Sequence, residues 1–397
     1  MYRIDADSIA GIEFELNWES GYAKHTEIYY LRINFWRDIL PGNMKQELMG
    51  KIVGDKIELD FAPGQGVPLY ESKKELHLKR GQFNDSRIQP RSGRFYPGGL
   101  LRDVAGIYPQ NIVPFRCVGL DADSLIADFN HPLASYGFHL TATVRDIMPK
   151  PYDRGGGSLL LTEQLTEGPG MQARHKGLPT DFFSSDAFLR ENPEPDEQFY
   201  TKPRFVVHTD TRFIKEISAL YGRFIRPGTA ILDLMSSWRS HVPESAEFDS
   251  LVGLGMNQEE MADNPQLSDY LVHDVNQNPK LPFENQQFDL VICTVSAEYM
   301  TCPVEVFSDA ARILRPGGYF VLTFSNRWFP PKVISLWTEL HEFERIGLVT
   351  EYFLRSGYYE HIETLSSRGW SRPADDKYYA QMPFADPVYA VWGQLIS

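Results

Sequence analysis

The sequence predicts a β-rich α+β domain followed by a doubly wound, Rossmann-like α/β domain. Near the amino terminus, apolar and polar side chains alternate, whereas beyond residue 200 short apolar strands alternate with amphipathic helices. A stretch rich in glycine and proline separates these two patterns. With 397 residues, the chain is also too long for a single hydrophobic core.

The first pattern is that of an antiparallel sheet. In residues 11–19, Ile12, Phe14, Leu16 and Trp18 share one side, as expected for a strand with one solvated face. Further strands are expected at 55–61 and 138–147, with a short helix at 43–50, while 64–114 show little periodicity. Residues 149–200 predict a mobile connector, although Phe182 and Phe183 could dock on a domain surface.

The second pattern predicts a parallel sheet with helices on both faces. Strands are expected at 230–234, 250–254, 270–272, 288–293, 319–324, 361–365 and 388–395. Helices are expected at 208–224, 256–264, 304–314 and 332–344. Ligands of such sheets bind beyond the carboxyl ends of the strands, near the point where the strand order reverses.

Composition narrows the class of protein. The formal net charge of -14 argues against broad binding to nucleic-acid phosphates. The three cysteines have neither metal-ligand nor disulfide spacing, which fits a reducing cytosol. No basic-then-apolar pattern typical of a leader precedes Gly11, and no apolar stretch reaches the ~20 residues of a membrane span. We therefore expect a cytoplasmic protein with no metal site and no nucleic-acid or membrane partner; the sequence does not predict its oligomeric state.

Four motifs follow one another beyond residue 201. Asp233 ends the first strand, and L-P-F at 281–283, F-D-L-V at 288–291 and L-R-P-G-G at 314–318 come after it. In this order, residues 201–397 resemble a class I S-adenosylmethionine (SAM) methyltransferase of the methyltransferase type 11 kind. The resemblance implies SAM as cofactor and a small molecule or a protein as methyl acceptor.

The resemblance also implies a cofactor site, made of Asp233, Met235, Ser236, Ser237, Gly253, Gly255, Asn257, Asp274, Val275 and Ser296. Asp274 stands where the family's acid approaches the adenine amino group. Met235-Ser236-Ser237-Trp238 replaces the family's glycine-rich turn, and Gly255-Met256-Asn257 lacks its ribose-binding carboxylate. A methyltransferase-like group with an L-D-L-M-S-S-W loop shares both changes. Glu259 and Glu260 are expected on a helix surface.

Glu298, Tyr299 and His241 are the catalytic candidates. Glu298 and Tyr299 follow the fourth strand, where the family lines its methyl-transfer cleft, and His241 follows the variant loop. Each has a structural alternative: a solvated glutamate, a packed tyrosine and a histidine packed near Pro243.

The amino-terminal half carries I-L-P-G at 39–42, V-G-D-K at 53–56 and D-F-N-H-P-L-A at 128–134. Residues 1–148 thereby resemble an FKBP-type peptidyl-prolyl isomerase with a domain, about 64–125, inserted in its flap. Lys24-His25 stands where the acid of the isomerase pocket is expected. The sequence thus predicts an FKBP-like domain at 1–148 that recruits the acceptor, a linker at 149–200 and a SAM methyltransferase at 201–397. The alternatives are a non-catalytic binding protein or folding helper with a degenerate SAM site, and an isomerase.

Overall fold

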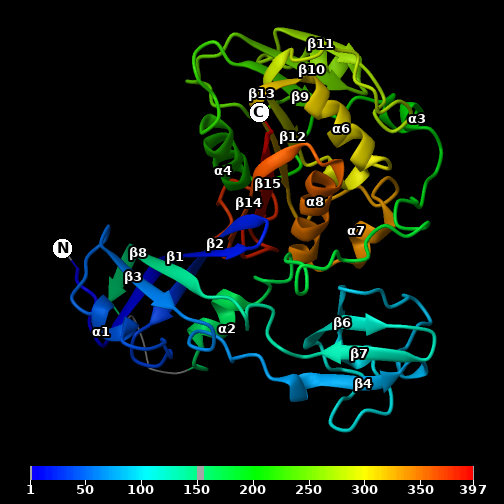
Figure 1. Ribbon diagram of the computed structural model, residues 1–397. Coiled ribbons are helices and arrows are strands. Elements are labelled where there is room, and N and C mark those ends of the chain that lie inside the picture. The colour runs from blue at the N-terminus through cyan, green and yellow to red at the C-terminus, as the bar shows by residue number, and fades with distance from the viewer. Residues whose placement is uncertain (1, 150–155, 397) are drawn as a thin grey trace. The chain divides into compact units, whose positions relative to one another are not determined.

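A computed structural model describes residues 2–149 and 156–396, which form two compact units (Figure 1). The first unit comprises Met1–Gly21, His25–Ser184 and Leu340–Leu348; the second comprises Tyr22–Lys24, Ser185–Glu339 and Val349–Ser397. The main division thus falls after Ser184, inside the stretch expected to be a linker. Among the described residues, no helix is long and apolar enough to cross a membrane.

The first unit contains an antiparallel sheet in the order β2-β1-β8-β3. Its strands are β1 (Ser8–Ser20), β2 (Ala23–Asn34), β3 (Lys56–Phe61) and β8 (Phe138–Pro149), and the short helix α1 covers Met44–Leu48. Phe14 pairs with Ala142 and Leu16 with Leu140, and all four side chains are buried. The alternation seen in the sequence therefore does place one face of the sheet in a core.

A second, smaller sheet in this unit has the order β4-β7-β6-β5. It comprises β4 (Glu75–Lys79), β5 (Phe95–Pro97), β6 (Pro114–Leu120) and β7 (Ser124–Asp128), with 3₁₀ turns at Ser72–Lys74, Arg80–Gln82 and Gly98–Leu100. Phe83, Tyr96 and Phe115 form a separate aromatic core for it. These short strands escape a periodicity search because β5 has only three residues.

The expected mobile connector is wrong for residues 156–200, while residues 150–155 lie outside the described residues. Helix α2 (Leu161–Thr166) and the buried side chains of Met171, Ala173 and Phe182 belong to the packed part of the first unit. Gly170 has φ 96°, and a Cβ there would lie 2.8 Å from Pro132. The lack of a side chain at Gly170 therefore allows the backbone to pack closely against Pro132, and this glycine does not indicate a flexible linker.

The second unit contains a sheet in the order β11-β10-β9-β12-β13-β15-β14. The strands are β9 (Ala230–Leu234), β10 (Ser250–Gly255), β11 (Asp269–Val272), β12 (Phe288–Thr294), β13 (Leu314–Phe324), β14 (Tyr359–Arg368) and β15 (Val388–Leu395). Strands β9 to β13 are parallel, and β15 is antiparallel to both of its neighbours. This is the doubly wound sheet that the sequence predicts.

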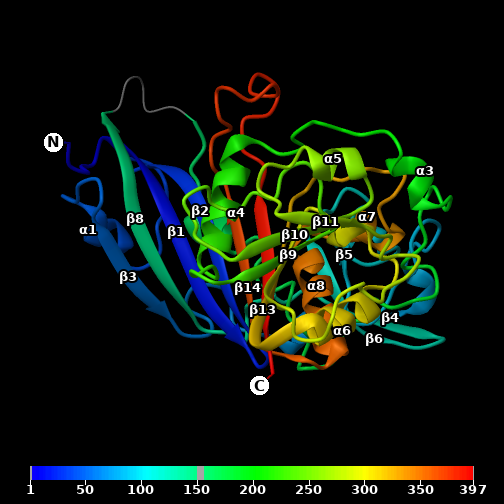
Figure 2. The same ribbon diagram turned by 90° about the horizontal axis from the view of Figure 1, so that it is seen from above.

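Helices cover both faces of this sheet (Figure 2). On one face, α4 (Thr211–Gly222) packs Ile217 and Tyr221 against the strands. On the other, Phe307 of α6 (Pro303–Ile313) and Phe353 of α8 (Glu342–Ser356) meet Phe320 of β13. The remaining helices are α3 (Asp196–Tyr200), α5 (Gln258–Ala262), α7 (Ser335–Glu339) and the 3₁₀ turn Ala297–Tyr299.

The single helix expected at 332–344 is wrong, because the chain forms α7 and then begins α8 anew. The nitrogen Nδ1 of His341 accepts a hydrogen bond from the backbone of Phe343, and Glu344 accepts one from the backbone of His341. Such reciprocal hydrogen bonds are typical of the first residues of a helix. A new helix therefore begins after His341, although the apolar periodicity of the sequence continues from α7 into α8.

Candidate functional site

A cavity of about 580 Å³ lies at the carboxyl ends of the parallel strands of the second unit, where the strand order reverses between β9 and β12. Its volume is within the range of about 300–1,000 Å³ that is usual for small-molecule sites. All cofactor residues expected from the sequence line this cavity, apart from Gly253. Of the catalytic candidates, His241 and Tyr299 line it and Glu298 does not.

The loop after β9 is held by its own serines. Met235 adopts φ 59°, a left-handed conformation that glycine adopts more easily. The backbone N–H of Ser236 donates to the carbonyl of Leu254 at 2.8 Å. The hydroxyls of Ser236 and Ser240 both donate to Oδ2 of Asp233, at 2.6 and 2.7 Å. The serines therefore fix a turn that the family builds with glycine.

A second set of hydrogen bonds fastens this loop to Glu260 of α5 and to Asn264, which follows that helix. Nδ2 of Asn264 donates to Oγ of Ser240 at 2.9 Å and to the carbonyl of Ser237 at 3.0 Å. The hydroxyl of Ser237 donates to Oε2 of Glu260 at 2.6 Å. Because these polar groups are paired, the loop keeps one conformation at the edge of the cavity.

Gly255 explains how the two departures from the family pattern belong together. A Cβ at Gly255 would lie 2.1 Å from the carbonyl oxygen of Ser236. That contact is impossible, so the serine loop can occupy its place only if the end of β10 carries glycine. The change in the first loop and the glycine of the second strand are therefore coupled by direct contact.

The carboxyl group of Asp233 holds the loop after β9 in place, because it accepts hydrogen bonds from two serines of that loop. Its side chain is buried, and this burial raises the pKa of Asp233 to about 7, although the hydrogen bonds from Ser236 and Ser240 act in the opposite direction. The carboxyl group is therefore partly protonated near neutral pH. A group in this state can accept the two serine hydroxyls without a full buried charge.

At the end of β10 the structure places Asn257 in a structural position. Its Oδ1 accepts the backbone N–H of Glu260 in the first turn of α5, and its Nδ2 donates to the carbonyl of Tyr200 at 2.7 Å. The expectation that Glu260 lies on a helix surface is wrong, since its side chain is buried and lines the cavity. A carboxylate is thus present beside the second strand, one helical turn later than expected.

Asp274 and Val275 follow β11 and line the cavity. Oδ1 of Asp274 accepts the backbone N–H groups of Asn276 and Gln277, at 2.9 and 3.2 Å. Among the described residues, Oδ2 of Asp274 has no hydrogen-bond donor. This oxygen is therefore available to accept a ligand amino group.

Of the three candidate residues that follow β12, Ser296 and Tyr299 line the cavity and Glu298 does not. The hydroxyl of Ser296 donates to the carbonyl of Thr294, and Glu298 is fully buried away from the cavity. The hydroxyl of Tyr299 accepts the backbone N–H of Phe329 at 2.8 Å. Burial, and then the charge of Glu298, raise the pKa of Tyr299 well above its usual value. Tyr299 therefore stays protonated and is suited to hydrogen bonding, not to accepting a proton.

His241 lies at the cavity wall with φ 59°. Burial, and to a smaller extent Arg239, lower the pKa of His241 to about 4. Its imidazole is therefore neutral near pH 7 and is only a weak base.

Sequence reasoning missed the segment 196–209, which lines one side of the cavity. The guanidinium of Arg204 lies 4.3 Å from the ring centre of Phe199, and its backbone N–H donates to Glu260 at 2.7 Å. The ring of His208 meets that of Phe329 edge-on at 4.9 Å. The available signal was the apolar run Phe205-Val206-Val207 next to a stretch that otherwise resembles a linker.

Asp196 fastens this segment. Its carboxylate, 4% exposed, lies 3.0 Å from Nζ of Lys332 and 2.8 Å from Nη1 of Arg190, and it accepts Nδ2 of Asn276 at 2.9 Å. Burial alone would raise the pKa of Asp196, but the hydrogen bonds from these three partners outweigh it and lower the pKa. The carboxylate is therefore ionised and holds 190–196 to the loops after β11 and β13.

Part of the second unit matches a known protein family. Residues 249–322 match the family described as a methyltransferase domain. A malonyl-[acyl-carrier protein] O-methyltransferase of Marinomonas is 25% identical over 67 residues, which is 17% of this chain and 25% of that protein. The chain therefore spans a quarter of the length of this relative.

Two more proteins are similar to parts of this chain. A short-type peptidyl-prolyl cis-trans isomerase of Methanocaldococcus jannaschii is 25% identical over 134 residues, covering 32% of this chain and 78% of that protein. An S-adenosylmethionine dependent methyltransferase structure from Mesorhizobium loti has a TM-score of 0.30 at 17% identity, over 44% of this chain and 96% of that one. Residues 249–322 thus match a methyltransferase domain, in line with the enzyme class expected from the sequence.

Proposed function

We propose that the second unit transfers a methyl group from SAM to an acceptor bound in the 580 Å³ cavity. The observation that carries this proposal is the position of the cavity, which lies at the reversal of strand order in a domain that matches methyltransferases. When bound, SAM would supply a methyl group on a positively charged sulfur. The protein has to bind this group, orient the acceptor and exclude water.

The residues of the cavity fit such a cofactor. Oδ2 of Asp274 can accept the adenine amino group, and Val275 adds an apolar wall beside it. Since the amide of Asn257 is used within the protein, we propose that Glu260 supplies the missing carboxylate for the ribose. Each oxygen of Glu260 accepts one hydrogen bond, from Arg204 and from Ser237, and has a second lone pair for a hydroxyl donor.

We place the acceptor between the loops after β12 and β13 and the segment 196–209, which line the rest of the cavity. Tyr299 can donate to it as a neutral phenol. Burial lowers the pKa of His208, so its imidazole is neutral near pH 7. We propose His208, a neutral imidazole in the wall of the cavity, as the group that takes the acceptor's proton.

Asp274→Asn tests the proposal directly. The amide oxygen can still accept the N–H groups of Asn276 and Gln277, but an NH₂ replaces the free oxygen and opposes the adenine amino group. We expect isothermal titration to show SAM bound about tenfold more weakly or worse. Asp269→Asn is the control, since Asp269 is exposed at the opposite end of β11. If wild-type protein gives no heat and no thermal shift with SAM, the cavity serves another ligand and the proposal is wrong.

For the first unit we propose an FKBP-like fold that recruits or presents a peptide-like acceptor. Its similarity to the short-type isomerase supports the fold. At the expected position of the pocket acid, however, His25 is 1% exposed and stacks on Trp18 at 4.0 Å. Burial lowers the pKa of His25 to about 3, so this side chain is a neutral part of the core.

We therefore expect the full chain to leave the cis–trans isomerisation of a proline peptide at its uncatalysed rate. That reaction has a barrier of ~18–20 kcal/mol, which an isomerase lowers in a dry pocket. The measurement is a chymotrypsin-coupled peptide assay with increasing protein. A rate that rises in proportion to protein concentration would favour isomerase activity over the recruiting role.

A further inference from the structure

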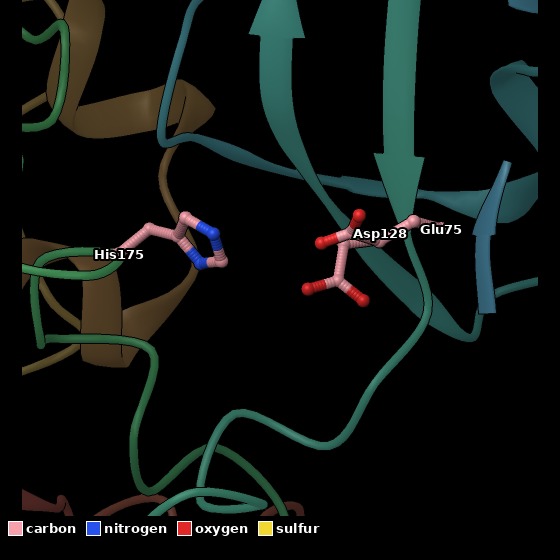
Figure 3. A group of neighbouring side chains, drawn as sticks. All are labelled: Glu75, Asp128 and His175. Carbon is pink, nitrogen blue, oxygen red and sulfur yellow. The ribbon is translucent and has the colours of Figure 1, made fainter. Parts of the chain in front are cut away.

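Three metal-ligating side chains converge in the first unit, away from the cavity. Glu75 begins β4, Asp128 ends β7, and His175 lies in the segment that follows α2. One oxygen of each carboxylate and one ring nitrogen of His175 all lie within 4.8 Å of one another. Figure 3 shows the imidazole of His175 on one side and the two carboxylates opposite it.

The two acids form a direct cross-strand pair. Glu75 and Asp128 are opposite one another in the antiparallel pairing of β4 with β7, so their side chains share a face. Like charges in such positions destabilise a sheet unless a cation lies between them. The Asp128 residue is 5% exposed, which makes its charge more costly to leave unbalanced.

Two positively charged side chains lie near this pair: Lys176, and Arg116, which stands opposite Asp128 in the pairing of β6 with β7. Nζ of Lys176 lies 3.6 Å from Oε1 of Glu75, but the lysine side chain is 63% exposed, so the interaction is weak. Within the described parts of the chain, Asp128 has no salt bridge to a lysine or an arginine. Arg116, on the neighbouring strand, donates to the carbonyls of Ala173 and Met171 and so positions the segment that carries His175.

The hydrogen bonds of the acids leave one oxygen of each for a ligand. Oε1 of Glu75 accepts the hydroxyl of Tyr70, and Oδ1 of Asp128 accepts the backbone N–H and the Nδ2 of Asn130, both at 2.8 Å. Across residues 2–149 and 156–396, no hydrogen bond is made to Oε2 of Glu75, to Oδ2 of Asp128 or to the ring of His175. Such outer hydrogen bonds are what orients the ligands of a metal.

We propose that Glu75, Asp128 and His175 bind a divalent transition-metal ion, with Zn²⁺ as the best fit. An imidazole with two carboxylates suits zinc, whereas Ca²⁺ takes 6–8 oxygen ligands and Mg²⁺ prefers oxygen in a strict octahedron. Three protein ligands leave a position for water. The ion would tie the insert strands β4 and β7 to the segment around His175. The cysteine spacing, on which the expectation of no metal site was based, could not reveal this set.

Zinc titration of the full, chelator-treated chain tests the site. We expect one Zn²⁺ bound per chain in isothermal titration and a higher thermal unfolding temperature, since the ion binds the folded state. His175→Ala should weaken binding about tenfold or more. His77→Ala is the matched control, because His77 lies exposed on β4, the strand that carries Glu75, and its loss should leave binding unchanged.

Lys176→Gln gives a second test on a side chain whose exposure makes misfolding no concern. Removing the amine that competes for Glu75 should raise the affinity for Zn²⁺. The proposal is overturned if neither the wild type nor Lys176→Gln binds zinc. It is also overturned if His175→Ala binds as tightly as the wild type, which would point to another group such as Cys302.

Discussion

Asp196→Ala is expected to lower the stability of the second unit by about 3–5 kcal/mol, because it removes one partner of a buried ion pair. Lys332 has no exposure, and without Asp196 its ammonium keeps the carbonyl of Glu194 at 2.6 Å and the ring of Phe199 at 5.6 Å, but no counter-charge from Asp196. Arg190 would lose the same carboxylate. We therefore expect residues 190–209 to detach from the cavity, which urea unfolding and limited proteolysis can both detect.

Two comparisons make this expectation specific. Asp263→Ala removes an ion pair whose atoms are 3.7 Å apart and whose side chains are 36% and 59% exposed, so it should change stability by less than about 1 kcal/mol. The double variant Asp196→Leu with Lys332→Met replaces both charges by apolar groups, and it should be more stable than Asp196→Ala. A double variant that is less stable than Asp196→Ala contradicts the assignment of the loss to the unpaired charge of Lys332.

The sheet of the second unit could be predicted because its signals are local. Residues 230–234 and 388–395 form strands with the expected bounds, since their apolar and β-branched residues are buried on both faces. Asp274 could be placed by its position after a strand. In each case a few neighbouring residues determine the result.

The parts that escaped prediction depend on contacts between distant residues. Glu260 is exposed or buried according to whether Ser237 and Arg204 reach it, and neither contact can be seen in the helix itself. Gly168-Pro169-Gly170 has the composition of a linker, yet Gly170 is packed against Pro132. Composition alone does not separate a glycine that allows flexibility from one that allows close packing.

Gly255→Ala is expected to displace the serine loop, and with it to weaken SAM binding about tenfold or more. The new Cβ would lie 2.1 Å from the carbonyl oxygen of Ser236. This backbone atom cannot move alone, because the N–H of Ser236 is bonded to Leu254 and its hydroxyl to Asp233. We also expect a loss of about 1–3 kcal/mol in stability, as for other overpacked sites.

Gly253→Ala is the control for Gly255→Ala. It tests whether any glycine substitution in β10 weakens SAM binding, or only one that displaces the serine loop. A Cβ at Gly253 would lie 2.6 Å from Cδ1 of Leu267, the end of a flexible side chain that can rotate away. Its nearest loop atom is Oγ of Ser236 at 3.2 Å. Gly253→Ala should therefore keep SAM binding close to the wild type in isothermal titration. If both variants weaken SAM binding equally, strand geometry controls the site, and contact between Gly255 and the serine loop does not.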